Sequence, residues 1–400
     1  MANSVCQRKG VTLLLALMVL LVQGCASVPA RTPMTEEAYP DSRVLGMTGL
    51  RFWGDEILPI AKDLPDELSI EELRELFPGL VGREMNLLAI SGGGANGAFA
   101  AGLLNAWTDS GTRPEFNIVT GISTGALIAP FAFLGPDYDD SLEKFYTQYS
   151  TKDLVTERGW LRTFMGGEAG YNTDLLREEL SRYIDEDLML AIAAEHKRGR
   201  MLFVGTTNLD AARAVNWDIG AIASSGKAGA LNLIRNVILA SASIPIAFPP
   251  VMIDVEANGQ TYDEMHTDGG VSRQSFMFYM SAEEDAFEGL NIVGQPRAYI
   301  IRNSKLETSW QTVDRRVYEI AGRSASSMVH TQGIGDLYRE FLGASKFGVD
   351  FNLAYIPQDF DVESEELFDK DYMKALYRLG YELAIDGYTW KKLPPGLGPR

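Results

Sequence analysis

The stretches that decide the fold of this chain are two glycine-rich turns, Ser91-Gly92-Gly93-Gly94-Ala95-Asn96-Gly97 and Gly121-Ile122-Ser123-Thr124-Gly125. A short apolar run precedes each turn, at residues 85–90 and 116–120, and a longer helix-prone run follows each, at residues 98–107 and 126–134. Strand, glycine turn and helix therefore occur twice, 123 − 92 = 31 residues apart, which matches one right-handed βαβ unit of ~30 residues. We expect both turns at the carboxyl ends of adjacent parallel strands, the edge at which open α/β sheets bind ligands.

The two turns admit two functional interpretations. The pattern Gly92-x-Gly94-x-x-Gly97 matches a dinucleotide fingerprint, but that site needs an acid at the end of the next strand, and Glu115 stands before that strand. The pattern Gly121-x-Ser123-x-Gly125 is that of a nucleophile elbow, whose glycines leave room for a sharp strand-to-helix turn. Ser123 alone would equally suit a small residue in a tight turn. Because both turns have a strand before them and a helix after them, we favour the hydrolase hypothesis.

A serine nucleophile needs a base and hydrogen-bond donors for an oxyanion. The backbone amides of Gly92-Gly93-Gly94, beside a helix N-terminus, are candidate donors. In Asp268-Gly269-Gly270, two glycines follow an acid and allow its turn to approach another chain segment closely. Taken alone, Asp268 would equally be a turn residue that accepts a hydrogen bond from its own backbone.

Only three histidines are present, which limits mechanisms that need several of them. His330 has the position along the chain that a Ser-acid-His triad requires, although it lies far from the glycine turns in sequence. His266 would share a strand face with Asp268, and we expect it to be packed in the core. His196 stands in a charged stretch, and we expect it to be solvated.

Together these motifs resemble the patatin-like phospholipases. The resemblance covers residues 85–275 and rests on four stretches, namely Gly92-Gly93-Gly94-x-x-Gly97 as oxyanion loop, Gly121-x-Ser123-x-Gly125 as elbow, residues 240–250 as the segment before the acid strand, and Asp268-Gly269-Gly270 as acid motif. It implies a three-layer α/β/α sandwich around a largely parallel central sheet. It also implies a catalytic dyad, Ser123 as nucleophile and Asp268 as general base, that cleaves carboxylic esters of lipid-like substrates without a catalytic histidine.

One position departs from the family pattern. The family loop usually carries Arg or Lys just before its last glycine, and this chain has Asn96 before Gly97. Asparagine can donate a hydrogen bond but brings no positive charge. The substitution therefore favours less charged acyl esters over phospholipids to a modest degree.

The composition narrows the range of partners and cofactors. The chain has 54 acidic and 36 basic residues, a net charge of −18, which argues against nucleic acid and against electrostatic docking on anionic lipid. Its 46% hydrophobic and 22% charged residues are typical of a globular protein. Two cysteines and three histidines form no metal-binding motif, so we predict no metal and no cofactor.

The first 24 residues resemble a lipoprotein signal peptide. Arg8 and Lys9 precede an apolar run at 11–22, which is shorter than the ~20 residues of a membrane span. The run ends in Val22-Gln23-Gly24-Cys25, which resembles a lipobox. We expect lipidation of Cys25 and attachment to the bacterial envelope, with Ala26 favouring the periplasmic side of the outer membrane. An ordinary secretory signal with a chance cysteine is the alternative.

The remaining chain divides into three predicted parts. Residues 25–84 are expected to be a tether, since Pro29, Pro33 and Pro40 interrupt regular elements, followed by a helical lead-in, in which Ser69 and Glu72 have the spacing of a capping box. Residues 85–305 are the predicted catalytic domain, and residues 306–400 a C-terminal extension packed on it. Residues 160–167 combine apolar side chains with two glycines, which indicates a packed loop or, less favoured, a mobile flap. A catalytically silent envelope lipoprotein that binds lipid or a partner remains the alternative function.

Overall fold

The structure is a computed structural model that describes residues 30–56, 69–76, 78–158, 169–277 and 290–397. The predicted signal peptide at 1–24, Cys25 and the predicted loop or flap at 160–167 lie outside these residues.

The centre of the molecule is a nine-stranded sheet with the order β1-β7-β6-β3-β2-β10-β11, to which β9 pairs at β6 and β8 pairs at β9. Five neighbouring strands, β6, β3, β2, β10 and β11, run parallel, and the pairs at the β7 edge and along β8 and β9 are antiparallel. The strands are β1 (Arg51–Trp53), β2 (Asn86–Ile90), β3 (Ile118–Ile122), β6 (Met201–Asn208), β7 (Arg213–Asp218), β8 (Val251–Ala257), β9 (Gln260–Asp268), β10 (Arg297–Arg302) and β11 (Asp350–Tyr355).

Strands β2 and β3 are direct parallel neighbours, with Leu87 opposite Ile118 and Ile90 opposite Gly121. All five residues of each strand are buried, because helices cover both faces of the parallel region. The two glycine turns therefore leave the sheet side by side at the same edge. This confirms the arrangement expected from the 31-residue spacing.

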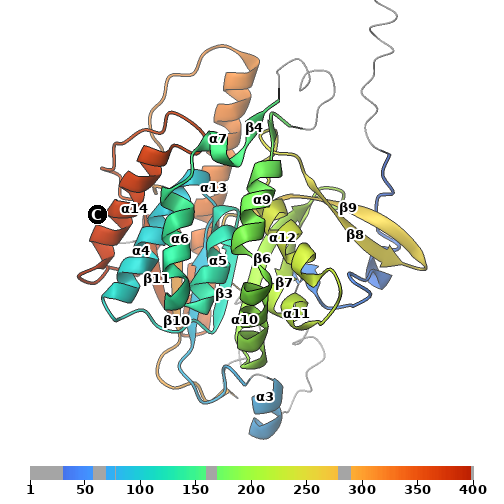
Figure 1. The fold of residues 1–400 in the computed structure, drawn as a ribbon. Coiled ribbons are helices and arrows are strands. Elements are labelled where there is room, and N and C mark those ends of the chain that lie inside the picture. The colour runs from blue at the N-terminus through green and yellow to red at the C-terminus, as the bar shows by residue number, and fades with distance from the viewer. Residues whose placement is uncertain (1–29, 57–68, 77, 159–168, 278–289, 398–400) are drawn as a thin grey trace, which may run out of the picture.

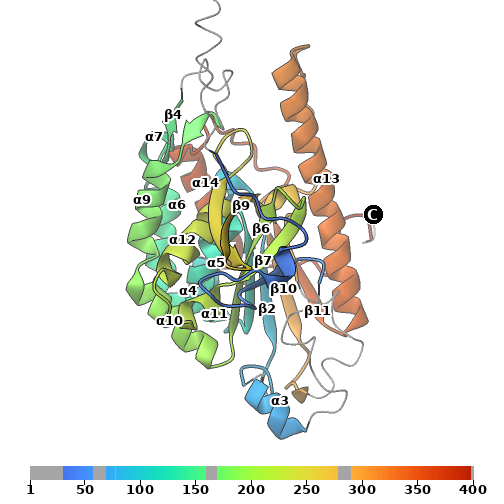
Figure 2. The same ribbon diagram turned by 90° about the vertical axis from the view of Figure 1, so that its right-hand side faces the viewer.

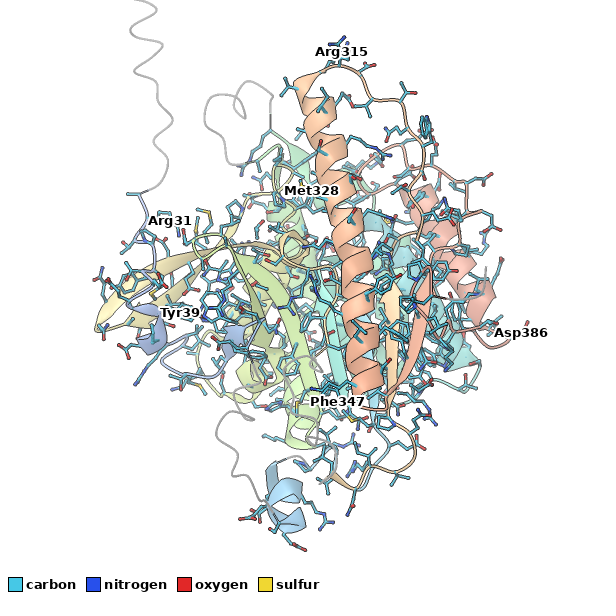
Figure 3. The ribbon with its side chains drawn as sticks, turned by 180° about the vertical axis from the view of Figure 1, so that it is seen from behind. Arg31, Tyr39, Arg315, Met328, Phe347 and Asp386 are labelled. Atoms are coloured by element: carbon cyan, nitrogen blue, oxygen red, sulfur yellow. The ribbon has the colours of Figure 1, made fainter. Side chains whose placement is uncertain are left out.

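Helices cover the two faces of the sheet unequally (Figures 1 and 2). One face carries the long helix α13 (Val317–Lys346), whose packed residues Leu337 and Ala344 lie in the same apolar cluster as Leu353 of the sheet. Figure 3 shows α13 running across the back of the molecule, with Arg315 near its first turn and Phe347 just after its last. The other face carries the remaining long helices, which are α4 (Gly97–Asp109), α5 (Thr124–Leu134), α6 (Asp139–Thr147), α9 (Asp174–Tyr183), α10 (Glu186–Lys197), α11 (Ile219–Ser224), α12 (Ala230–Ser241) and α14 (Lys370–Ala384). The predicted three-layer α/β/α architecture is confirmed.

Short elements lie around the central sheet and the helices that cover it. A two-stranded sheet pairs β4 (Thr156–Glu157) with β5 (Tyr171–Asn172), and α7 (Thr151–Leu154) precedes it. Helix α3 (Ile70–Leu76) begins with the expected capping box, since Glu72 Oε2 accepts from the Ser69 backbone N–H at 2.8 Å and the Ser69 hydroxyl accepts from the Glu72 N–H at 3.3 Å. The remaining short elements are the single-turn helices Tyr39–Asp41, Gly94–Asn96, Pro136–Tyr138 and Gly269–Val271.

The segment from residue 30 to residue 53 is not a free tether, which corrects the prediction. Arg31 forms ion pairs with Asp210 at 2.6 Å and with Asp263 at 2.8 Å. Val44 and Leu50 are buried, and β1 extends the sheet by pairing with β7. The prolines that suggested a linker interrupt regular structure but leave apolar side chains free to pack.

The C-terminal part shares the sheet with the rest of the chain. Strand β11 pairs in parallel with β10 at the edge of the sheet. Helix α14 packs along α4 so closely that a Cβ on Gly102 would lie 2.0 Å from the Tyr377 carbonyl oxygen, and one on Gly380 would lie 2.3 Å from that of Phe99. The two glycines therefore allow the helix backbones to touch.

Candidate active site

Ser123 stands on a strained turn between β3 and α5. Its backbone has φ 56° and ψ −123°, a conformation that residues other than glycine rarely adopt. A Cβ on Gly121 would lie 2.3 Å from the Gly125 carbonyl oxygen, and one on Gly125 would lie 2.1 Å from that of Ile90. The glycines at these two positions therefore permit the turn. The Ser123 N–H donates to the Ser241 hydroxyl oxygen at 2.9 Å, which fixes the turn against the end of α12.

Asp268 is the last residue of β9 and lies beside Ser123. Its backbone N–H donates to the Ser243 carbonyl oxygen at 3.0 Å, and its carboxylate accepts from the Gly270 N–H at 2.7 Å. The Ser123 side chain lies close enough to this carboxylate to lower its pKa. The structure thus brings together the two residues that the sequence predicted as a dyad, 145 positions apart (268 − 123).

Burial controls the protonation of Asp268. The removal of the carboxyl group from water raises its pKa from 3.8 to about 7, while the nearby Ser123 side chain and the hydrogen bond from Gly270 act in the opposite direction. A carboxylate with a pKa near neutrality holds a proton more strongly than an ordinary aspartate. It is therefore better matched to proton transfer at neutral pH.

The glycine loop presents two free amides next to Ser123. The N–H groups of Gly93 and Gly94 donate no hydrogen bond to another described residue, and Gly94 (φ 58°) lines the same pocket as Ser123. The Gly92 N–H instead donates to the Gln274 carbonyl oxygen at 3.1 Å. The prediction that all three amides face an oxyanion is therefore corrected, because Gly92 is used to hold the loop.

Asn96 braces the same loop from the outside. Its Nδ2 donates to the Asn303 carbonyl oxygen at 3.1 Å, and its Oδ1 accepts from the Tyr372 hydroxyl at 2.7 Å. Asn303 also presses on Gly93, where an added Cβ would lie 2.5 Å from the Asn303 carbonyl oxygen. Asn96 thus ties the glycine loop to the end of β10 and to α14.

The other predicted glycines allow close packing around the dyad. A Cβ on Gly97 would lie 2.1 Å from Thr124 Oγ1, so Gly97 lets the starts of α4 and α5 meet. A Cβ on Gly269 would lie 2.4 Å from the Gly205 carbonyl oxygen, so the acid motif packs directly on β6. At Gly270, an added Cβ would lie 2.9 Å from Asp268 Oδ1.

An apolar pocket opens beside Ser123. Its free volume is about 30 Å³, roughly room for one or two water molecules. It is lined by Gly94, Ser123, Thr124, Leu127, Phe145, Tyr146, Leu154, Leu176, Ala242, Ile244, Phe248, Phe368 and Met373. The thirteen positions come from both the predicted catalytic domain and the C-terminal part. A pocket of this composition suits a hydrocarbon group attached to the atom that Ser123 would attack.

None of the three histidines hydrogen-bonds to the dyad. His266 is fully buried, with Nδ1 2.9 Å from Thr206 Oγ1 and Nε2 3.1 Å from Glu264 Oε2, which confirms the predicted core histidine. His330 lies half-buried on α13, and burial lowers its pKa. His196 was expected in solvent but is half-buried, with Nδ1 4.0 Å from Asp218 Oδ1, because α10 packs against α11.

Sequence reasoning missed several residues that shape the site. Gln274 holds Gly92, Tyr372 holds Asn96, and Phe368 and Met373 line the pocket. No motif marks them, since their positions follow from how distant segments pack. Asn303 follows the last residue of β10. Its Nδ2 donates to the Ser91 carbonyl oxygen at 2.9 Å, which supports the loop from behind.

Among the described residues, no group of three or more His, Cys, Asp or Glu side chains is placed to hold a metal ion. No helix in this part of the chain combines the length and the apolar character needed to cross a bilayer.

Comparison with known proteins gives one family match. Residues 88–276 match the family model described as patatin-like phospholipase. No curated protein is similar enough in sequence to count as a relative. Among solved structures, the crystal structure of VipD from Legionella pneumophila matches at 11% sequence identity and a TM-score of 0.33, covering 74% of this chain and 67% of the VipD chain.

Proposed function

Because residues 88–276 form a patatin-like phospholipase domain, we propose that this chain is a serine acyl hydrolase with a Ser123–Asp268 dyad. At the family level the domain indicates hydrolysis of lipid esters. The observation that carries the proposal is the closeness of the Ser123 side chain to the buried Asp268 carboxylate, whose pKa it lowers, beside an apolar pocket that Ser123 itself lines.

Acylation begins when Ser123 Oγ attacks the ester carbonyl carbon. The hydroxyl proton passes to the Asp268 carboxylate, and the carbonyl oxygen becomes an oxyanion that accepts from the Gly93 and Gly94 N–H groups. When the tetrahedral intermediate collapses, the carbon–oxygen bond to the alcohol breaks. The departing alkoxide takes the proton from Asp268, and the acyl group remains on Ser123 Oγ.

Deacylation repeats these steps with water. Asp268 accepts a proton from the attacking water, a second oxyanion forms at the same amides, and collapse releases the carboxylic acid as Ser123 regains its proton. Even with a raised pKa, an aspartate is a weak base for a serine hydroxyl. The reaction therefore depends on the two free amides about as strongly as on the base.

A serine-directed probe tests the nucleophile. A fluorophosphonate should label the full chain, and Ser123→Ala should abolish the labelling. Asp268→Asn should abolish turnover of a soluble ester, whereas His330→Ala should retain it. Labelling that survives Ser123→Ala, or loss of turnover in His330→Ala alone, would contradict the dyad. A folded wild type with no turnover of any ester would point to a catalytically silent lipid-binding protein.

We further propose that the mature chain is anchored by lipid on Cys25 in the bacterial envelope, on the periplasmic side of the outer membrane. Support comes from the lipobox-like end of the apolar run at residues 22–25 and from Ala26. In cells, wild type should sediment with the membranes and carry an acyl mass on its N-terminal peptide. Cys25→Ser should appear in the soluble fraction. A wild-type N-terminus cleaved elsewhere would contradict the anchor.

A further inference from the structure

We propose that Phe368 and Met373 close the pocket beside Ser123 and restrict the enzyme to esters of short acyl chains. The inference rests on the proposed hydrolase function and adds a substrate class to it. Both residues lie well beyond the family match that ends at residue 276, so the matched domain alone does not contain the whole pocket.

Phe368 is held in the pocket wall by contacts on two sides. Its ring is parallel to that of Phe248, with 6.4 Å between centroids and 2° between the planes. Its backbone N–H donates to the Thr151 hydroxyl oxygen at 2.9 Å, which attaches it to the start of α7. The side chain therefore has a fixed place opposite the elbow.

Met373 is fixed by the helix that carries it. Helix α14 begins at an Asp369 cap, whose carboxylate accepts from the backbone N–H groups of Asp371 and Tyr372. The helix then packs on α4 through the Gly102–Tyr377 contact. Met373, in the first turn, is 2% exposed. Displacing it would require movement of a helix that is packed along its length.

The remaining walls leave little room for expansion. Phe145, Leu154 and Leu176 also line the pocket and are all buried in the core, where side chains are packed at crystal-like density. The free volume of about 30 Å³ is room for roughly one or two water molecules, so only the first carbons of an acyl chain fit without movement of the wall. A longer chain fits only if Phe368 or Met373 moves aside.

A series of soluble esters tests the length limit. The full chain should be assayed with p-nitrophenyl acetate, butyrate, octanoate and dodecanoate under monomeric substrate conditions. We expect kcat/KM to be highest for acetate or butyrate and at least ~10-fold lower for octanoate, since side chains packed at core density obstruct the longer chain before its carbonyl group can reach Ser123.

Two variants should increase the length of acyl chain that the enzyme accepts, and one matched variant should not. Phe368→Ala and Met373→Ala should each raise the octanoate-to-butyrate ratio of kcat/KM by ~10-fold or more. Leu379→Ala removes a similar side chain from the same helix α14 but does not line the pocket, so it should leave the ratio unchanged. Thermal unfolding of all three variants separates loss of folding from a change of specificity.

The outcomes distinguish this inference from the proposed function. Wild-type kcat/KM that rises steadily to dodecanoate would overturn the length limit while leaving the hydrolase intact. Equal ratios in Met373→Ala and Leu379→Ala would overturn the role of the C-terminal residues. Absence of turnover with every ester would instead reject the hydrolase, on which the inference depends.

Discussion

The Tyr372 hydroxyl donates to Asn96 Oδ1 at 2.7 Å, a hydrogen bond between residues 276 positions apart. It links α14 to the loop that carries the free Gly93 and Gly94 amides and, through Gly94, lines the Ser123 pocket. Asn96 in turn donates to the Asn303 carbonyl oxygen at 3.1 Å. With its oxygen and one N–H engaged, Asn96 is a brace for the loop and brings no charge to the site. A loop with Arg or Lys at this position would carry a positive charge there, whereas this loop does not.

Tyr372→Phe should lower kcat by about 3- to 10-fold, with little change in KM. The variant removes one hydrogen bond that holds the glycine loop, and a net loss of about 0.6–1.4 kcal/mol in the placement of the oxyanion donors corresponds to that range. The measurement is steady-state kinetics with p-nitrophenyl butyrate.

Tyr381→Phe is the matched control for this prediction. The Tyr381 hydroxyl donates to Asp109 Oδ2 at 2.7 Å on the same pair of helices, but in solvent and outside the pocket. Its kinetics should equal those of wild type. An equal loss in both variants would mean that α14 acts through general stability rather than through Asn96.

The pH profile of kcat/KM should rise through an apparent pKa of about 7, the value to which burial raises that of Asp268. The base must be ionised to accept the Ser123 proton, so activity is low below this pKa and reaches a plateau above it. A histidine could produce a similar profile. The single variants His196→Ala, His266→Ala and His330→Ala, each checked for folding, should therefore keep the inflection.

Asp268→Asn should be inactive yet more stable than wild type at neutral and alkaline pH. The folded-state pKa of about 7 lies above the unfolded value of about 3.9. Burial of Asp268 therefore favours folding fully only below about pH 4, and this contribution is lost as pH rises to about 7. The Asn variant does not ionise. The difference in Tm between the Asn variant and wild type should widen between pH 4 and pH 7 and stay constant above pH 7. A difference that does not depend on pH would contradict the raised pKa of Asp268.

Ser123→Gly should unfold at a higher temperature than Ser123→Ala, although both are inactive. With φ 56° and ψ −123°, Ala keeps the strain of about 1–3 kcal/mol that glycine relieves, and this exceeds the extra chain entropy of Gly, about 0.5–1 kcal/mol. Thermal unfolding at one pH gives the comparison. Equal Tm values would show that the turn stores no strain at this residue.

Local patterns explain what could be predicted from the sequence. The elbow needs small residues at 121 and 125, the strands need short apolar runs, and Asp268 needs glycines after it. Each requirement determines the residue types at a few neighbouring positions. The parallel pair β2–β3 and the Ser123–Asp268 pair could therefore be predicted from the sequence.

The parts of the site that were not predicted depend on contacts between distant segments. In the sequence, Gly92 and Gly93 are equivalent candidates for oxyanion donors. In the structure, the Gly92 N–H donates to the Gln274 carbonyl oxygen instead. Prolines around residues 29–40 suggested a linker, but Arg31 forms ion pairs with Asp210 in the β6–β7 turn and with Asp263 on β9. Phe368 and Met373 belong to the C-terminal part, and only its packing on α4 and α7 brings them to the pocket.

The buried Asp336 on α13 gives the last prediction, because it supports the glycine loop through Gln274. Its Oδ2 accepts from the Gln274 N–H at 2.7 Å, and the Gln274 carbonyl oxygen accepts from the Gly92 N–H at 3.1 Å. Asp336→Ala would leave a buried N–H unpaired, which costs about 1–3 kcal/mol of stability. Asp336→Ala should also lower kcat more than it raises KM, since the loop that carries the Gly93 and Gly94 N–H donors is then held less firmly. Asp336→Asn keeps an acceptor at the same place and should restore most of kcat. If Asn and Ala at this position were equally impaired, the charge of Asp336 rather than its hydrogen bond to Gln274 would be what positions the loop.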